Sequence, residues 1–193
     1  MTLRLDLLRH GETELGGGLR GSLDDALTDL GWQQMRTAVA ELALEPPWDR
    51  IVSSPLQRCA RFAEELASKL SLPLQLEAGI QELHFGDWEG IGTAQLMDTD
   101  AEGLGRFWED PYSFTPRNGE PVLAFASRVL GAIKRLQQAF DGERILLVSH
   151  GGVMRLLLAQ ARGLPREQLL QVVVGHGGLF GLAVESDGQL TEV

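Results

Sequence analysis

The sequence predicts a layered α/β/α fold built on a mostly parallel central sheet. Short apolar runs alternate along the chain with longer amphipathic segments, the order typical of parallel strands connected by covering helices. The run Ile145-Leu146-Leu147-Val148 is apolar at successive positions, as expected of a strand that helices cover on both faces. The chain has 193 residues, which suits one domain with a sizeable core. We therefore expect a single domain spanning residues 1–193.

The strands are predicted from short apolar runs that end at turn-forming residues. The parallel strands are expected at 3–8, 50–53, 72–76 and 144–149. Near the end of the chain, the runs 170–174 and 179–184 flank the turn Gly175-His176-Gly177-Gly178 and predict a hairpin.

The helices are predicted from apolar residues at helical spacing and from end signals. Thr28 has the side chain of an N-cap, and Pro46-Pro47 would end the helix that follows. The face of this first helix that we expect to be apolar contains Leu30, Met35, Ala38, Val39 and Leu42. A second helix is expected from Ser54-Pro55 to about residue 70, with Pro55 in its first turn. Two further helices are expected at 122–140 and 153–161.

The stretch 79–120 has no sustained period and is rich in glycine, proline and aromatic residues. We expect it to form a loop with one or two short helices. Such an excursion from a compact domain is often a cap that covers the substrate. Trp88, Phe107 and Trp108 would then line a substrate pocket or form a small core inside the cap.

The composition limits the classes of partner. The formal net charge is −10, which argues against nucleic acid or an anionic membrane as the main partner. The single cysteine, Cys59, excludes an intramolecular disulfide and a thiolate metal cluster, and we expect it to be a small buried residue. The N-terminus does not resemble a signal peptide, and no apolar stretch is long enough to span a membrane. These features favour the cytoplasm.

Two of the four histidines occupy the same kind of position. His10 ends the first predicted strand, His150 ends the strand at 144–149, and a glycine follows each of them. Because the carboxyl ends of parallel strands meet at one edge of a sheet, we expect the two imidazoles to lie close together. Arg9 precedes His10, and Arg58 lies about one helical turn beyond the strand end at Ser53-Ser54. These arginines can reach the same edge.

This set of side chains suits the chemistry of a phosphoryl group. Arginine forks match the geometry of phosphate oxygens, and nearby guanidinium groups keep an imidazole neutral and therefore nucleophilic. A second imidazole can donate to the charge that develops during transfer. The leaving alkoxide then needs a proton, which a nearby carboxyl group can supply.

The sequence resembles the histidine phosphatase superfamily, the phosphoglycerate-mutase-like proteins. The resemblance begins at Arg9-His10-Gly11, the motif that names the superfamily. Four further blocks follow in the family's order and cover most of the chain: Leu27-Thr28-Asp29-Leu30-Gly31, Ser53-Ser54-Pro55-Leu56-Gln57-Arg58, Glu82-Leu83-His84-Phe85-Gly86-Asp87-Trp88-Glu89-Gly90 and Val148-Ser149-His150-Gly151-Gly152. One such motif would be weak evidence, whereas five in order are strong.

The resemblance implies a role for each matched residue. His10 would become phosphorylated, and the side chains that bind the phosphate would be those of Arg9, Arg58 and His150. Glu82 would protonate the leaving group and later help to activate water; only the resemblance selects it among 27 acidic residues. The resemblance implies no metal and no other cofactor.

The stretch after the RHG motif departs from the family's pattern. Many members have an asparagine there that reaches the phosphate, whereas this chain has Glu12-Thr13-Glu14-Leu15-Gly16. Arg20 is included among the substrate-binding candidates, and the sequence leaves open whether it replaces that contact. Four acidic residues in the neighbourhood are expected to form a solvated loop face: Glu12, Glu14, Asp24 and Asp25.

Hydrolysis of a small phosphomonoester is the expected activity. The mutases of the superfamily are longer than this chain, and a non-catalytic phosphate-binding module would be expected to lack His10 or Glu82. A metal-dependent hydrolase is disfavoured because two histidines without clustered carboxylates make a poor metal site. His84 is expected to be a cap residue, and His176 to decorate a turn at the pocket rim. The sequence leaves open whether the chain forms a homodimer.

Overall fold

The computed structural model describes residues 1–44 and 46–193 and contains one six-stranded sheet. The strand order is β3-β2-β4-β1-β5-β6. β1 to β4 are mutually parallel, whereas β5 pairs antiparallel with β1 and with β6, so the prediction of a mostly parallel sheet is confirmed. The strands are β1 (Leu3–Arg9), β2 (Arg50–Ser53), β3 (Leu74–Leu76), β4 (Arg144–Ser149), β5 (Leu179–Val184) and β6 (Leu190–Glu192).

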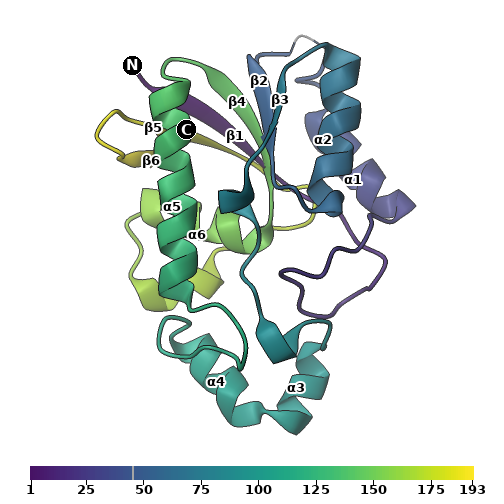
Figure 1. Cartoon of the computed structure of the whole chain (residues 1–193), viewed down its shortest axis with the longest axis vertical. Coiled ribbons are helices and arrows are strands. Elements are labelled where there is room, and N and C mark those ends of the chain that lie inside the picture. Colours follow the sequence, from purple (N-terminus) through teal and green to yellow (C-terminus); the bar gives the residue numbers. More distant parts are fainter. Residues whose placement is uncertain (45) are drawn as a thin grey trace.

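Helices cover both faces of the sheet (Figure 1), which confirms the layered α/β/α fold. Successive side chains of β4 point to opposite faces of the sheet, so both faces are apolar and need cover. Ile145 and Leu147 pack into one apolar cluster, whereas Leu146 and Val148 pack into the other. One layer contains α1 (Asp29–Val39) and α2 (Gln57–Leu70), and the other contains α5 (Val122–Ala139) and α6 (Gly151–Ala161). Within residues 1–44 and 46–193, no helix has the length and apolar character needed to span a bilayer.

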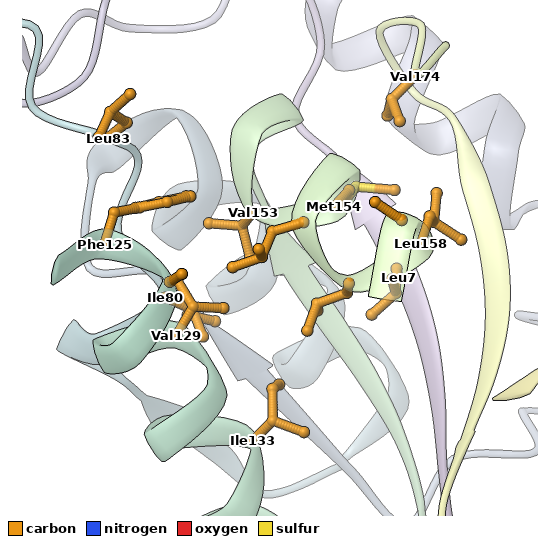
Figure 2. Close-up of a cluster of buried hydrophobic side chains, with 14 of the residues drawn as sticks. Leu7, Ile80, Leu83, Phe125, Val129, Ile133, Val153, Met154, Leu158 and Val174 are labelled. Atoms are coloured by element: carbon orange, nitrogen blue, oxygen red, sulfur yellow. The ribbon is translucent and has the colours of Figure 1, made fainter. Parts of the chain in front are cut away.

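The core beneath α5 and α6 also holds the segment that precedes the cap. Figure 2 shows Val129 and Ile133 of α5 beside Val153 and Met154 of α6, over Leu7 of β1. Ile80 and Leu83 belong to the same buried cluster. Gln81 and Glu82, which lie between Ile80 and Leu83 in the chain, are therefore anchored on both sides by apolar packing.

The predicted cap contains short elements at one end of the molecule (Figure 1). They are η2 (Gly86–Trp88), α3 (Thr93–Thr99) and α4 (Ala101–Glu109), whereas η1 (Ala78–Ile80) precedes them and packs in the core beside α5. The prediction of short helices in this stretch is confirmed. Aromatic packing holds the cap together, because the ring centroid of Trp88 lies 5.8 Å from that of Phe107 and 5.5 Å from that of Phe114.

The predicted hairpin near the C-terminus is wrong. Residues Arg166–Gln171 form a 3₁₀ helix, η3, and β5 forms its hairpin with β6 instead. The extended residues that follow η3 bond to arginine side chains, because Arg155 Nε donates to the carbonyl of Val172 and Arg9 Nη1 donates to that of Val174. These carbonyls are satisfied without a neighbouring strand.

The helices differ from the predictions in one buried face and at two helix starts. Leu30 is 48% exposed, because Gly31, Met35 and Val39 form the buried face of α1. Pro55 precedes α2, whose N-cap is Leu56. The predicted helix at 153–161 begins two residues earlier, at Gly151. The Thr28 N-cap is confirmed, since its side chain accepts a hydrogen bond from the amide of Gly31.

Gly31 allows α1 to approach the turn after β1. A Cβ atom at Gly31 would lie 2.1 Å from the carbonyl oxygen of Glu12, whereas one at Gly131 in α5 would have its nearest neighbour at 3.6 Å. We expect Gly31→Ala to lower the free energy of unfolding by about 1–3 kcal/mol, because backbone must move. Gly131→Ala should raise it by about 0.5–1 kcal/mol through helix propensity. Chemical denaturation measures the free energy of unfolding of both variants. If both substitutions stabilised the protein, the close approach of α1 to the turn after β1 would be contradicted.

Candidate active site

The carboxyl ends of three neighbouring strands bring the predicted histidines together. β4 lies between β2 and β1, so His150, which follows β4, lies between Ser54 and His10, which follow the other two. The ring centroids of His10 and His150 are 5.4 Å apart. This is the edge of an open α/β sheet at which ligands bind.

His10 is held as a neutral imidazole. Its side chain is buried, and Nδ1 lies 2.8 Å from the carbonyl oxygen of Gly11. That carbonyl can only accept, so Nδ1 carries the hydrogen and Nε2 keeps its lone pair. Burial, followed by the positive charge of Arg58 and Arg9, lowers the pKa of His10 well below its ordinary value. The result is an uncharged nucleophilic nitrogen at neutral pH.

His150 is completely buried beneath the site. Its Nε2 lies 2.7 Å from Oγ of Ser54, and Sγ of Cys59 lies 3.8 Å from the same nitrogen. Burial and the neighbouring Arg58 lower the pKa of His150 well below the usual value. Cys59 is buried, and burial raises the pKa of its thiol so that the thiol stays protonated. Its environment lacks the activation that a reactive cysteine needs.

Arg58 is also completely buried, and loop carbonyls compensate its charge. Its Nη1 donates to the carbonyl of Leu23 at 2.5 Å and its Nη2 to that of Gly21 at 2.8 Å. The Nε groups of Arg58 and Arg9 are buried and find no hydrogen-bond acceptor within the described part of the chain. Unmet buried donors cost free energy, and an anion would supply acceptors.

Glu89 fixes the loop that holds Arg58. Its carboxylate accepts hydrogen bonds from the amides of Gly21 and Ser22, both at 2.9 Å, and from that of Phe85 in the cap at 3.1 Å. Burial acts to raise the pKa of Glu89, but these backbone donors outweigh it and lower the pKa. Sequence reasoning missed this role, although Glu89 lies inside one of the quoted motif blocks.

Asp25 is not part of a solvated face, contrary to the prediction. It is buried, with Oδ2 3.2 Å from Nε of Arg20 and Oδ1 3.9 Å from Nη1 of Arg58. Arg20 also donates through Nη2 to the carbonyl of Gly16 at 2.6 Å. Arg20 and Arg58 both lie close enough to Arg9 to lower its pKa, so Arg9, Arg20 and Arg58 form one cationic cluster.

The other acidic residues of the loop differ in solvent exposure and in their contacts. Glu14 and Asp24 are exposed, whereas Glu12 is half-buried and its Oε1 accepts from the hydroxyl of Thr28 at 3.0 Å. Asp24 also accepts a hydrogen bond from the amide of Gln57 at the start of α2. These contacts tie the loop to both helices of this layer.

Glu82 faces the start of α6. Its Oε2 accepts from the amide of Gly152 at 2.9 Å, and its Oε1 accepts from the amide of Leu83 at 3.0 Å. Arg128 of α5 fixes the same segment, because Nη2 donates to the carbonyl of Glu82 at 2.9 Å and Nη1 to that of Gln81 at 2.8 Å. Arg128 was not expected from the sequence, because nothing in its helix marks it.

A cavity of about 380 Å³ lies beside Glu82. Aromatic side chains from the cap and from α5 form part of its wall, namely Phe85, Phe107, Trp108 and Phe125. Trp88 does not line it: that indole is buried in the cap and donates through Nε1 to Asp100 at 3.1 Å. Of the aromatic residues predicted in the cap, Phe107 and Trp108 thus line the cavity, whereas Trp88 belongs to the small core inside the cap.

The remaining two histidines lie in different parts of the structure. His84 is exposed on the cap. His176, expected to be a turn residue at the rim, has its ring centroid 5.9 Å from that of His10. Within residues 1–44 and 46–193, no three His, Cys, Asp or Glu side chains cluster closely enough to hold a metal ion.

Comparison with known proteins connects this geometry to a family. The family model described as Histidine phosphatase superfamily (branch 1) matches residues 5–192. An adenosylcobalamin/alpha-ribazole phosphatase of Salmonella typhimurium is 34% identical over 177 residues, covering 91% of this chain and 87% of that protein. A glucosyl-3-phosphoglycerate phosphatase of Mycolicibacterium vanbaalenii is 37% identical, with coverages of 84% and 75%.

The solved structures agree with these relatives. The crystal structure of the alpha-ribazole phosphatase from Shigella flexneri matches with a TM-score of 0.84 at 32% identity, covering 98% of this chain and 94% of that one. The similarity therefore extends over sheet, helices and cap together. The chain belongs to the histidine phosphatase superfamily and is a phosphatase, a phosphoric monoester hydrolase.

Proposed function

We propose that this protein hydrolyses α-ribazole 5′-phosphate, a late step of cobalamin assembly, through a phosphohistidine on His10. The observation that carries the proposal is a neutral, buried imidazole flanked by Arg9, Arg58 and His150. A single domain would perform the reaction, with residues 79–120 as the cap over the substrate. The site residues of this proposal are His10, Glu82 and His150 for chemistry and Arg9, Arg20, Arg58 and His150 for binding.

The geometry supports a two-step reaction. In the first step, Nε2 of His10 attacks phosphorus, a P–N bond forms, and the P–O bond to the leaving alcohol breaks. Glu82 gives its proton to the leaving oxygen. In the second step, Glu82 takes a proton from water as the water attacks phosphorus, and the P–N bond breaks to release phosphate. The cationic cluster stabilises the charge on the equatorial oxygens throughout.

The cavity supports a substrate that carries an aromatic ring. Phe85, Phe107 and Phe125 offer apolar and aromatic surface beside Glu82, where the leaving group would lie. The benzimidazole-like ring of α-ribazole can stack on such surface. The relatives named for α-ribazole phosphatase activity support the same choice.

A second candidate is a sugar or phosphoglycerate phosphatase, a broad-specificity phosphatase or a mutase of the superfamily. The wall of the cavity also contains Arg155, whose guanidinium would suit a carboxylate on the substrate. The relative named as a glucosyl-3-phosphoglycerate phosphatase fits this alternative. A non-catalytic phosphate-binding module is less favoured, because His10 and Glu82 are both present. The cytoplasm remains a prediction from the sequence, which leaves open whether the chain forms a homodimer.

We expect His10→Ala to lower kcat by about 10⁴-fold or more, because the nitrogen that forms the covalent bond is removed. His84→Ala, on the exposed surface of the cap, is the matched control and should retain activity. Circular dichroism and thermal unfolding would show that both variants are folded. Substantial turnover by His10→Ala would rule out the phosphohistidine.

We expect Glu82→Gln to slow hydrolysis of an alkyl phosphate by about 10²- to 10⁴-fold, because the alkoxide then leaves without a proton. Hydrolysis of p-nitrophenyl phosphate should be slowed much less, since p-nitrophenolate is a stable leaving group. The measurement is kcat/KM for both substrates. Equal slowing of both would remove Glu82 from the role of general acid.

The substrate is tested by phosphate release in EDTA from α-ribazole 5′-phosphate, sugar phosphates, nucleotides and phosphoglycerates. We expect kcat/KM to favour α-ribazole 5′-phosphate by about 100-fold, or roughly 2.7 kcal/mol of transition-state discrimination. A flat profile would indicate a general phosphomonoesterase. A preference for phosphoglycerates would favour the second candidate, and no release from any compound would favour the non-catalytic module.

A further inference from the structure

The mechanism above leaves the imidazole of His176 unused, although it lies near the proposed nucleophile. The ring centroids of His176 and His10 are 5.9 Å apart, and the two planes are tilted by 39°. His10 thus has two imidazole neighbours: His150 is completely buried, whereas His176 is exposed. His176 therefore borders the site from the solvent side.

We propose that His176 binds the phosphoryl group of the substrate and of the product as an imidazolium. This proposal rests on the proposed function, because it places the phosphate at His10. The bound dianion would draw a proton onto His176 from solvent, and the protonated ring would then donate a charge-assisted hydrogen bond to a phosphate oxygen. His176 would be a ligand of the phosphate, separate from the nucleophile and from the acid.

The loop that carries His176 is fixed to the end of β1. The carbonyl of Gly178 accepts from the amide of Arg9 at 3.0 Å, and the carbonyl of Val174 accepts from Arg9 Nη1 at 2.5 Å. The same residue, Arg9, thus binds the loop on both sides of His176 and immediately precedes His10. The position of His176 relative to His10 is consequently fixed by the backbone amide and the guanidinium of Arg9.

Gly177 adds a second constraint on this loop. Its φ is +67°, which side chains rarely tolerate, and a Cβ there would lie 2.9 Å from the carbonyl oxygen of Gln34 in α1. The amide of Gly178 closes the turn by donating a hydrogen bond to the carbonyl of Gly175 at 3.0 Å. The glycines therefore permit a tight turn against α1 that presents His176 beside His10.

The charges around His176 disfavour its protonation while no anion is bound. Partial burial and the positive charge of Arg9 and Arg20 lower the pKa of His176, and Glu12 opposes them. The imidazole of His10, another titratable neighbour, stays neutral because its own pKa is lowered well below the ordinary value. A phosphate dianion would offset the positive charge of these arginines, which raises the pKa of His176 and links anion binding to proton uptake.

The test measures binding of sulfate, which remains a dianion between pH 5.5 and 8.5. Isothermal titration calorimetry in buffers of different ionisation enthalpy gives both Kd and the number of protons taken up. The proteins are the unmodified chain, His176→Asn, and His84→Asn as the matched control on the cap. Thermal unfolding of each variant shows whether it remains folded.

We expect the unmodified protein to bind sulfate about tenfold more tightly at pH 5.5 than at pH 8.5, with proton uptake on binding. His176→Asn should bind about tenfold more weakly at pH 5.5, match the unmodified protein at pH 8.5, and take up fewer protons on binding. His84→Asn should behave like the unmodified protein.

Two outcomes would overturn the proposal. One is a His176→Asn variant with the same affinity and proton uptake as the unmodified protein. The other is an affinity loss that is equal at every pH, since this would exclude the imidazolium. The calorimetry does not depend on turnover. A protein that failed to hydrolyse the substrate would count against the proposed function, and the sulfate affinity and proton uptake would still test the role of His176.

Discussion

Burial of the Arg58 guanidinium at the carboxyl edge of the sheet is the interaction on which the rest of the site depends. A charge removed from water is costly unless hydrogen bonds compensate it. Here the carbonyls of Gly21 and Leu23 provide the compensation, with Asp25 nearby. Burial, together with this positive charge, lowers the pKa of His10 and of His150, so that both imidazoles stay neutral. The proposed nucleophile and the proposed anion site therefore both depend on Arg58.

The loop and the cap are coupled to this charge through Glu89. Its carboxylate accepts from amides of the Gly21 loop and from Phe85 of the cap, so the carbonyls that hold Arg58 are fixed by a cap residue. Arg128 performs a similar function for Glu82 by binding the carbonyls of its segment. The site is therefore built from the sheet edge and the cap together. The overall charge of −10 does not prevent anion binding, because the arginines gather in one place.

The fold class and much of the site followed from local patterns in the sequence. The strands that end at His10 and His150, the Thr28 N-cap and the short cap helices were all predicted, because periodicity and capping depend on residues close together in the chain. The convergence of strand ends also follows from the geometry of any parallel sheet. The family resemblance was needed to select Glu82, since its carboxylate has no local signal.

Other features depended on contacts between segments far apart in the chain. Asp25 is buried because Arg20 and Arg58 surround it, and the residues around Val172 and Val174 are not a strand because Arg155 and Arg9 bind their carbonyls. His176 lies beside His10 because Arg9 holds its loop, across more than 160 residues of sequence. Local propensity describes how a segment can fold, but the partners of a buried charge or carbonyl are chosen only when distant segments pack. That is why the tertiary structure alone placed these residues.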